Sequence, residues 1–147
     1  MTLKAWEQTN RWLVAHQTSR DEIASLLAVG DRDLRDSRVA GLSADARLSM
    51  AYSSALQFAS AALAAEGYRP ARGGDHHYRI IQALALTLGW DAKKVKRLDT
   101  FRTKRNTSAY ERAGEVSDAE AQEIQNMAAA LRDELVTWLG RNHPELI

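Results

Sequence analysis

The fold of this chain is decided by residues 44–66, which read ADARLSMAYSSALQFASAALAAE. Apolar and small side chains recur there at helical spacing and cover one broad face, namely Leu48, Tyr52, Ala55, Leu56, Ala59, Ala62 and Leu63. Many of these side chains are small, and small side chains let neighbouring helices approach closely. The stretch therefore predicts the central helix of a helical bundle.

The segments on either side of this stretch also carry helical patterns. Ser19 with Glu22, and Ser117 with Glu120, match the capping box that opens a helix. Apolar residues follow each of these boxes at helical spacing. We expect helices over residues 3–15, 20–39, 44–66, 76–88, 92–104 and 118–139.

Breaks between the helices are indicated by glycine, proline and aspartate. Residues 67–74 are the clearest loop, with Asp75 as the expected N-cap of the next helix and Asp91 as that of the helix after it. Gly30 interrupts the helix over 20–39, where we expect a kink or a break. Together these patterns predict an all-α fold, a bundle of five to six helices.

Composition narrows the possible classes of protein. With 147 residues, 45% of them hydrophobic and 27% charged, the chain suits one globular domain. A net charge of +1 means that any nucleic-acid surface would have to be local. The absence of cysteine excludes disulfides and thiolate sites. The chain shows no signal peptide and no apolar run of about 18–20 residues, so we expect a cytoplasmic protein without a membrane span.

The most distinctive chemistry lies in residues 101–110, which read FRTKRNTSAY. Three cations, Arg102, Lys104 and Arg105, are followed directly by the amide of Asn106, and Tyr110 closes the stretch. A local basic run of this kind is a candidate surface for the phosphate groups of a nucleotide or of RNA. We expect any chemistry specific to this protein to lie here.

Arg105 and Asn106, followed after three residues by Tyr110, resemble the signature of the HEPN superfamily of small helical nucleotide-binding domains. The similarity spans about residues 19–139 and includes an Ala-rich helix with a central tyrosine, Tyr52, and a helix led by two histidines. It implies that the chain is a single HEPN-like bundle and a homodimer. The motif looks most like a small bacterial branch whose members are often partners of minimal nucleotidyltransferases in toxin–antitoxin modules.

In nuclease members of this superfamily, an arginine and a histidine a few residues further on form the active site, where two copies meet across a homodimer cleft. By resemblance, Arg105 matches the arginine and Tyr110 takes the place of the histidine. Metal-free RNA cleavage needs a group that accepts the 2′-hydroxyl proton and cations that hold the phosphate. Tyrosine titrates near pH 10 and histidine near pH 6.5, so Tyr110 suits hydrogen bonding or stacking better than base catalysis.

Three functions follow. The first is an HEPN-like component of a toxin–antitoxin or defence-type module that binds a nucleotide, RNA or a partner protein through residues 102–110. Its expected binding residues are Arg102, Lys104, Arg105, Asn106, His76 and His77. The second is a metal-independent RNase toxin with Arg105 and Tyr110 as catalytic residues, or with His76 as the proton acceptor. The third is an interaction module without a role in nucleic-acid binding.

The same residues also allow purely structural interpretations. The three cations would also suit the last turn of a helix, where the macrodipole favours positive charge. Asn106 would serve as a helix C-cap, and Tyr110 as an anchor for the next loop. The resemblance implies a sharper functional hypothesis for Tyr110, namely that a partner nucleotidyltransferase attaches a nucleotide to its hydroxyl. His76 and His77 are adjacent and cannot form an i,i+4 metal pair, so we expect no metal site and no cofactor.

Overall fold

The structure, a computed structural model, describes residues 2–9, 12–72, 76–110 and 114–147, and leaves out the side chains of Thr9 and of residues 107–110. Six α-helices and two short strands lie within these residues. They are α1 (Leu3–Thr9), β1 (Leu13–Ala15), α2 (Arg20–Ser37), α3 (Ala44–Ala65), β2 (Tyr68–Pro70), α4 (His76–Thr87), α5 (Ala92–Tyr110) and α6 (Asp118–Asn142), with a final 3-10 turn at Pro144–Leu146. The predicted all-α bundle of five to six helices is confirmed.

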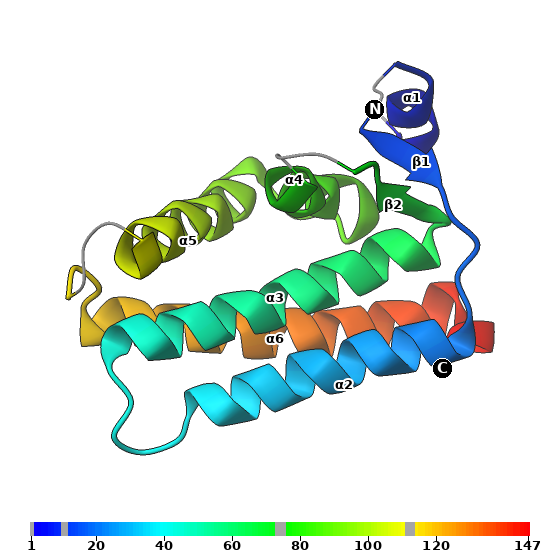
Figure 1. Cartoon of the computed structure of the whole chain (residues 1–147). Coiled ribbons are helices and arrows are strands. Elements are labelled where there is room, and N and C mark those ends of the chain that lie inside the picture. Colours follow the sequence, from blue (N-terminus) through cyan, green and yellow to red (C-terminus); the bar gives the residue numbers. More distant parts are fainter. Residues whose placement is uncertain (1, 10–11, 73–75, 111–113) are drawn as a thin grey trace.

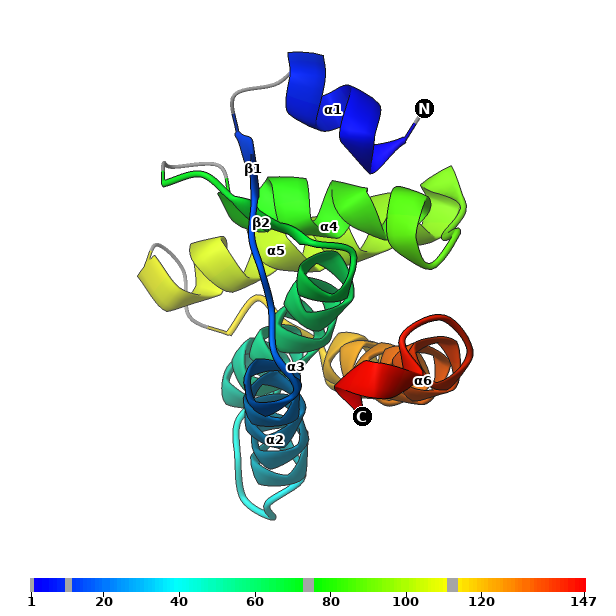
Figure 2. The same cartoon turned by 90° about the vertical axis from the view of Figure 1, so that its right-hand side faces the viewer.

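The helix α3 lies at the centre of the bundle and contacts four other helices (Figures 1 and 2). On one side it packs between α2 and α6, which run alongside it. On the opposite side α4 and α5 lie across it, and α1 lies beyond α4 (Figure 2). This arrangement brings one face of α5 against both α3 and α4, which matters for the basic motif.

Because α3 is covered on several sides, most of its length is buried. Its alanines at 51, 55, 59, 61 and 62 are at most 1% exposed, which agrees with the predicted close approach of neighbouring helices. A close approach to α2 occurs at Gly30, where a Cβ would lie 2.5 Å from Cε1 of Phe58. The helix α2 continues through Gly30, so the predicted break is wrong. Glycine is there because the Phe58 ring occupies the space of a side chain.

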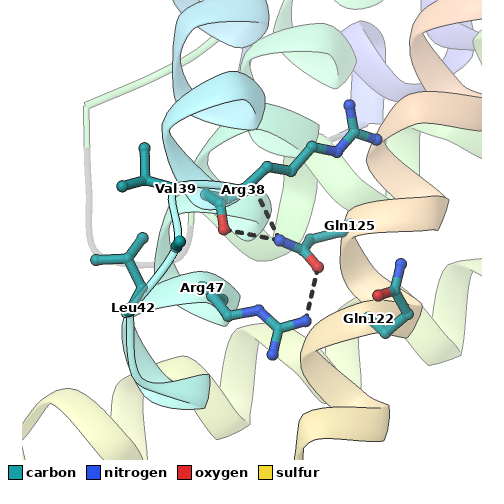
Figure 3. Close-up of a pocket in the computed structure, with 9 residues that line it drawn as sticks. Arg38, Val39, Leu42, Arg47, Gln122 and Gln125 are labelled. Carbon is teal, nitrogen blue, oxygen red and sulfur yellow. Dashed lines mark hydrogen bonds between the residues drawn. The ribbon is translucent and has the colours of Figure 1, made fainter.

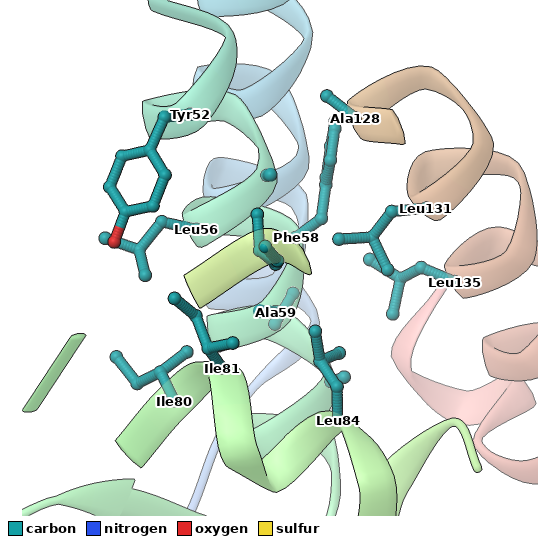
Figure 4. Close-up of a cluster of buried hydrophobic side chains, with 14 of the residues drawn as sticks. Tyr52, Leu56, Phe58, Ala59, Ile80, Ile81, Leu84, Ala128, Leu131 and Leu135 are labelled. Carbon is teal, nitrogen blue, oxygen red and sulfur yellow. The ribbon is translucent and has the colours of Figure 1, made fainter. Parts of the chain in front are cut away.

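The core is formed where α3, α4 and α6 meet (Figure 4). These three helices contribute five side chains that are fully buried, namely Phe58, Ile81, Leu84, Leu131 and Leu135. Burial of an aliphatic or aromatic side chain contributes roughly 1.5–3 kcal/mol. The same cluster holds Tyr52 at its edge, next to α5.

The N-terminal segment differs from the expected helix over residues 3–15. The helix α1 ends at Thr9, and residues 13–15 form β1, which pairs antiparallel with β2 so that Val14 lies opposite Arg69. The ladder is extended by a hydrogen bond from the His16 amide to the Gly67 carbonyl, 2.8 Å long. The partner strand comes more than fifty residues later, inside the expected loop, so the local pattern could not reveal this pairing.

Most of the predicted helix starts are confirmed. Ser117 and Glu120 form the complete capping box, and the Asp91 side chain accepts a hydrogen bond from the Lys94 amide at 2.8 Å. At α2 only half of the box forms, because Ser19 accepts from the Glu22 amide while the Glu22 carboxylate turns to other partners. Those partners are the Thr18 hydroxyl at 2.6 Å and His16 Nε2 at 2.7 Å. The predicted N-cap Asp75 lies outside the described residues.

Two helix ends differ from the prediction. The helix α2 ends at Ser37, so Val39 lies outside it and is 57% exposed. The helix α5 continues past Lys104 to Tyr110, since neither glycine nor proline interrupts it. Asn106 is therefore within the helix, and its expected role as a C-cap is wrong. A search of the described residues finds no helix that combines the length and the apolar character needed to cross a membrane.

Candidate functional site

Two residues of the basic motif, Arg102 and Arg105, lie on the face of α5 that packs against α3 and α4. Arg102 and Arg105 are three residues apart on this helix, so their side chains share one face. The guanidinium carbon of Arg105 lies 5.7 Å from the centre of the Tyr52 ring on α3. That of Arg102 lies 5.5 Å from the centre of the Tyr78 ring on α4. Each arginine therefore lies within cation–π distance of an aromatic ring, and the two rings belong to different helices.

His77 joins this group from α4. Its ring centre lies 6.3 Å from that of Tyr52 and 4.5 Å from that of His76. Burial lowers the pKa of His77 below its ordinary value of 6.5, and the neighbouring His76 lowers it further. The positive charges of Arg105 and Arg102 act in the same direction. At neutral pH the imidazole is therefore uncharged and keeps a nitrogen lone pair that can accept a proton.

Tyr52, on α3, is the buried residue of this group. It is 1% exposed, and its hydroxyl oxygen is buried without a hydrogen-bond partner among the described residues. Burial raises the pKa of this phenol, although Arg102 and Arg105 oppose the shift. A buried polar atom without a partner is uncommon and marks a position that calls for an explanation.

Asp99 supplies the acidic partner of this face. Its Oδ1 accepts from Nε of Arg102 at 2.7 Å, and both side chains are about a quarter exposed. The pair fixes one edge of the Arg102 guanidinium and directs that side chain along α5. Together these side chains form one cluster, which consists of Tyr52, His76, His77, Asp99, Arg102 and Arg105. The cluster contains two guanidinium groups and one carboxylate, so its formal charge is positive.

The remaining residues predicted from the motif lie elsewhere. Lys104 turns to the other side of α5, where its Nζ lies 2.7 Å from Oε2 of Glu120 on α6. Asn106 is exposed on the helix. Tyr110 is the last residue of α5, and its side chain lies outside the described part of the structure. The fold thus brings together four of the residues predicted from the motif, His76, His77, Arg102 and Arg105, and separates Lys104 from them.

Sequence reasoning missed Asp99 and Tyr78 as neighbours of the motif. The i,i+3 spacing of Asp99 and Arg102 on one helix was a usable signal for the ion pair. The contact of Arg102 with Tyr78 joins two helices, and no spacing along the chain indicates it.

A hollow of about 440 Å³ lies away from this cluster, where the loop after α2 meets α3 and α6 (Figure 3). Its polar groups bind one another. Nη2 of Arg47 donates to Oε1 of Gln125 at 3.0 Å, and Nε2 of Gln125 donates to the Ser37 carbonyl oxygen at 2.8 Å. Arg47 also meets the Asp118 carboxylate at 3.3 Å. These bonds tie three helices together, which is a structural role.

Comparisons with protein-family models and with curated proteins found no match to this chain. Across the residues that the structure describes, no group of three or more histidine, aspartate or glutamate side chains is arranged to hold a metal ion.

Proposed function

We propose that this protein is an HEPN-type domain that binds the phosphate groups of RNA at this cluster of six residues, which we call the phosphate cluster. The observation that supports the proposal is that Arg105 and the neutral His77 lie beside the Tyr52 ring, with Arg102 close enough to lower the pKa of His77 as well. Guanidinium groups on a rigid helix bind phosphate oxygens through paired hydrogen bonds. Because the net charge of the chain is only +1, this positive cluster would attract phosphate locally, without a basic charge over the whole surface.

The test is the affinity of the purified protein for a short fluorescent RNA, measured by anisotropy at two salt concentrations. Replacing Arg105 by alanine should weaken binding and flatten its dependence on salt, because one phosphate contact is lost. Lys104→Ala is the matched control, since it removes the same charge from the neighbouring residue on the other face of α5. Equal losses in both variants would mean a diffuse basic surface and would contradict the proposal.

A second candidate function, metal-independent RNA cleavage, is supported by one observation. His77 is uncharged at neutral pH and lies near Arg105, so a proton acceptor and a phosphate-binding cation are close together although the motif itself ends in Tyr110. Cleavage of RNA in the presence of EDTA, lost in His77→Ala and in Arg105→Ala, would establish this activity. Tyr110→Phe in the same assay reports whether the tyrosine hydroxyl takes part, and His76→Ala does the same for the other histidine.

The proposal also covers the biological setting. We propose a homodimer and a nucleotidyltransferase partner within a toxin–antitoxin or defence-type module, and both are supported by the HEPN resemblance of Arg105, Asn106 and Tyr110. Light scattering of the purified chain tests the homodimer. Intact mass after coexpression with such a nucleotidyltransferase tests whether Tyr110 receives a nucleotide, because the attached nucleotide would raise the mass of the wild type and leave Tyr110→Phe unchanged.

A further inference from the structure

A hollow of about 390 Å³ lies between α1, α4 and α5, and it is separate from the phosphate cluster but shares a wall with it. Its walls are mainly apolar, and the residues that matter here are Trp6, Tyr78, Gln82, Ala85, Val95 and Asp99. This volume is within the range of small-molecule sites, which combine apolar walls with a few polar groups. Figure 2 shows α1 lying over α4, which is how Trp6 comes to line a hollow of the helical bundle.

Two residues belong both to this hollow and to the surroundings of Arg102. Tyr78 lines the hollow, and its ring centre lies 5.5 Å from the Arg102 guanidinium carbon. Asp99 lines the hollow and binds Nε of Arg102 at 2.7 Å. A ligand that fills the hollow therefore lies beside Arg102, one of the two arginines proposed to bind its phosphate.

Cations and aromatic rings alternate along this face. The Trp6 and Trp12 rings meet edge to face at 5.1 Å, and the Arg79 guanidinium carbon lies 5.5 Å from the centre of the Trp12 ring. Arg79 also lies 5.6 Å from the centre of the Tyr78 ring. Trp6, Trp12 and Tyr78 are all partly exposed. Aromatic rings interleaved with arginines are the surface on which nucleobases stack while phosphates meet the cations.

Polar and aromatic groups at the wall indicate how a base would be held. The Asp99 carboxylate accepts hydrogen bonds and donates none when ionised. The Gln82 amide donates to the Tyr78 hydroxyl at 2.8 Å, which orients its nitrogen toward that hydroxyl. An exocyclic amino group and the N3–H of uracil can both donate to Asp99, so this carboxylate would hold a base without distinguishing adenine from uracil. Adenine differs from uracil in its larger face for stacking on the aromatic rings.

From these observations we propose that the hollow of Trp6, Tyr78 and Asp99 is a nucleobase subsite that prefers a purine such as adenine over uracil, because the purine has the larger face for stacking. The inference rests on the proposed binding of phosphate groups at Arg102 and Arg105, and adds the part of the ligand that the phosphate cluster does not contact. The base lies against the Trp6 and Tyr78 rings, and its phosphate lies toward Arg102.

The experiment compares three single strands of equal length, an oligoadenylate, an oligouridylate and an abasic phosphodiester strand. Because all three carry the same number of phosphates, their electrostatic contributions to binding cancel. We expect oligoadenylate to bind roughly tenfold more tightly than the abasic strand, with oligouridylate between them. Equal affinity for oligoadenylate and the abasic strand would overturn the subsite while leaving the phosphate-binding proposal intact. Loss of all binding would instead contradict the proposed function.

Two variants identify the hollow as the place of base binding. Ala85 is an exposed helical residue on its wall, so Ala85→Leu fills the hollow without disturbing the core. It should remove the preference for oligoadenylate and leave the affinity for the abasic strand unchanged. Ala130→Leu, at an exposed position of α6, is the matched control and should leave both affinities unchanged.

Trp6→Ala is the second variant and removes an aromatic wall instead of filling the space. It should also lower the preference for oligoadenylate, while thermal melting reports whether the fold persists. An unaltered preference in both Ala85→Leu and Trp6→Ala would overturn the subsite, because the base would then bind elsewhere.

Discussion

The guanidinium carbon of Arg105 lies 5.7 Å from the centre of the buried Tyr52 ring, so a cation of the basic motif rests on the central helix of the bundle. A cation–π contact of this kind contributes roughly 0.5–2 kcal/mol, more where water is excluded. It holds Arg105 against α3 instead of leaving it in solvent. The contact also places the positive charge near His77, whose pKa it lowers.

Tyr52→Phe should leave the fold intact and raise the free energy of unfolding by up to about 1 kcal/mol. The reason is that the variant removes a hydroxyl buried without a hydrogen-bond partner in the described structure, and such burial is unfavourable. The ring, and with it the contact to Arg105, is kept. Urea denaturation measures the change. Tyr78→Phe is the control, because Tyr78 accepts a hydrogen bond from Gln82 and should gain nothing. A Tyr52→Phe protein less stable than the Tyr78→Phe protein would contradict the prediction.

The titration of His77 should depend on Arg105. Removing this guanidinium in Arg105→Ala removes one cause of the lowered pKa, so the pKa of His77 should rise toward 6.5 while staying below it through burial. NMR titration of the imidazole protons measures the shift. Arg97→Ala is the control, because Arg97 pairs with Glu123 on α6 and is not among the groups that shift His77. An unmoved pKa in Arg105→Ala would show that the two groups do not interact.

The same lowered pKa makes stability depend on pH. Since the folded pKa of His77 lies below the ordinary 6.5, the unfolded chain binds more protons in this range. The contribution of the neutral imidazole is present above about pH 6.5 and is lost as the pH falls from there toward the folded pKa. Urea midpoints should therefore fall between about pH 7.5 and pH 5.5, and less so in His77→Gln, which cannot be protonated. Equal pH dependence in both proteins would assign the effect to other groups.

Gly30→Ala should destabilise the protein by roughly 1–3 kcal/mol, because the new Cβ would lie 2.5 Å from the Phe58 ring. Gly140→Ala in α6 is the matched control, since its Cβ would be 3.8 Å from Cδ1 of Ile147. There alanine should stabilise by up to about 1 kcal/mol through helix propensity. In a Phe58→Leu background, Gly30→Ala should lose most of its cost. Additive effects of the two changes would contradict the contact.

Gln125→Leu should lower the free energy of unfolding by roughly 1–3 kcal/mol. The buried Gln125 amide donates to the Ser37 carbonyl oxygen and accepts from Arg47, and leucine would leave both without this partner. Gln122→Leu is the control, because this exposed side chain on the same hollow bonds to Asn126 on the surface. Chemical denaturation should separate the two variants clearly, and similar stabilities would mean that the bonds of Gln125 contribute little.

Local sequence patterns predicted much of the fold. The helical period of residues 44–66 predicted α3, and the capping box of Ser117 and Glu120 predicted the start of α6, because both depend on groups within a few residues. The capping box at Ser19 forms only in part. Its glutamate, Glu22, binds His16 and Thr18 instead of the N-cap backbone, and a local pattern of residue types does not show which of these partners is preferred.

The candidate site was predictable only in outline. The sequence indicated that Arg102, Arg105, His76 and His77 belong together through the HEPN resemblance, and the fold does bring them to one face. It also grouped Lys104 with them, although a helix turns neighbouring side chains to different sides and Lys104 meets Glu120 instead. The length of α5 was underestimated, because a basic run without glycine can either end a helix or continue it.

By itself, the sequence determined an all-helical bundle with a small-residue central helix, since periodicity, capping and composition act over one or two turns of the chain. Only the tertiary structure decided that residues 13–15 pair with residues 68–70, that the Phe58 ring packs against Gly30, and that the Arg105 guanidinium lies over the Tyr52 ring. These three relationships join residues more than twenty positions apart. Their energy comes from close packing, hydrogen bonding and charge at short range in space, and nothing in the order of residues along the chain encodes those distances directly.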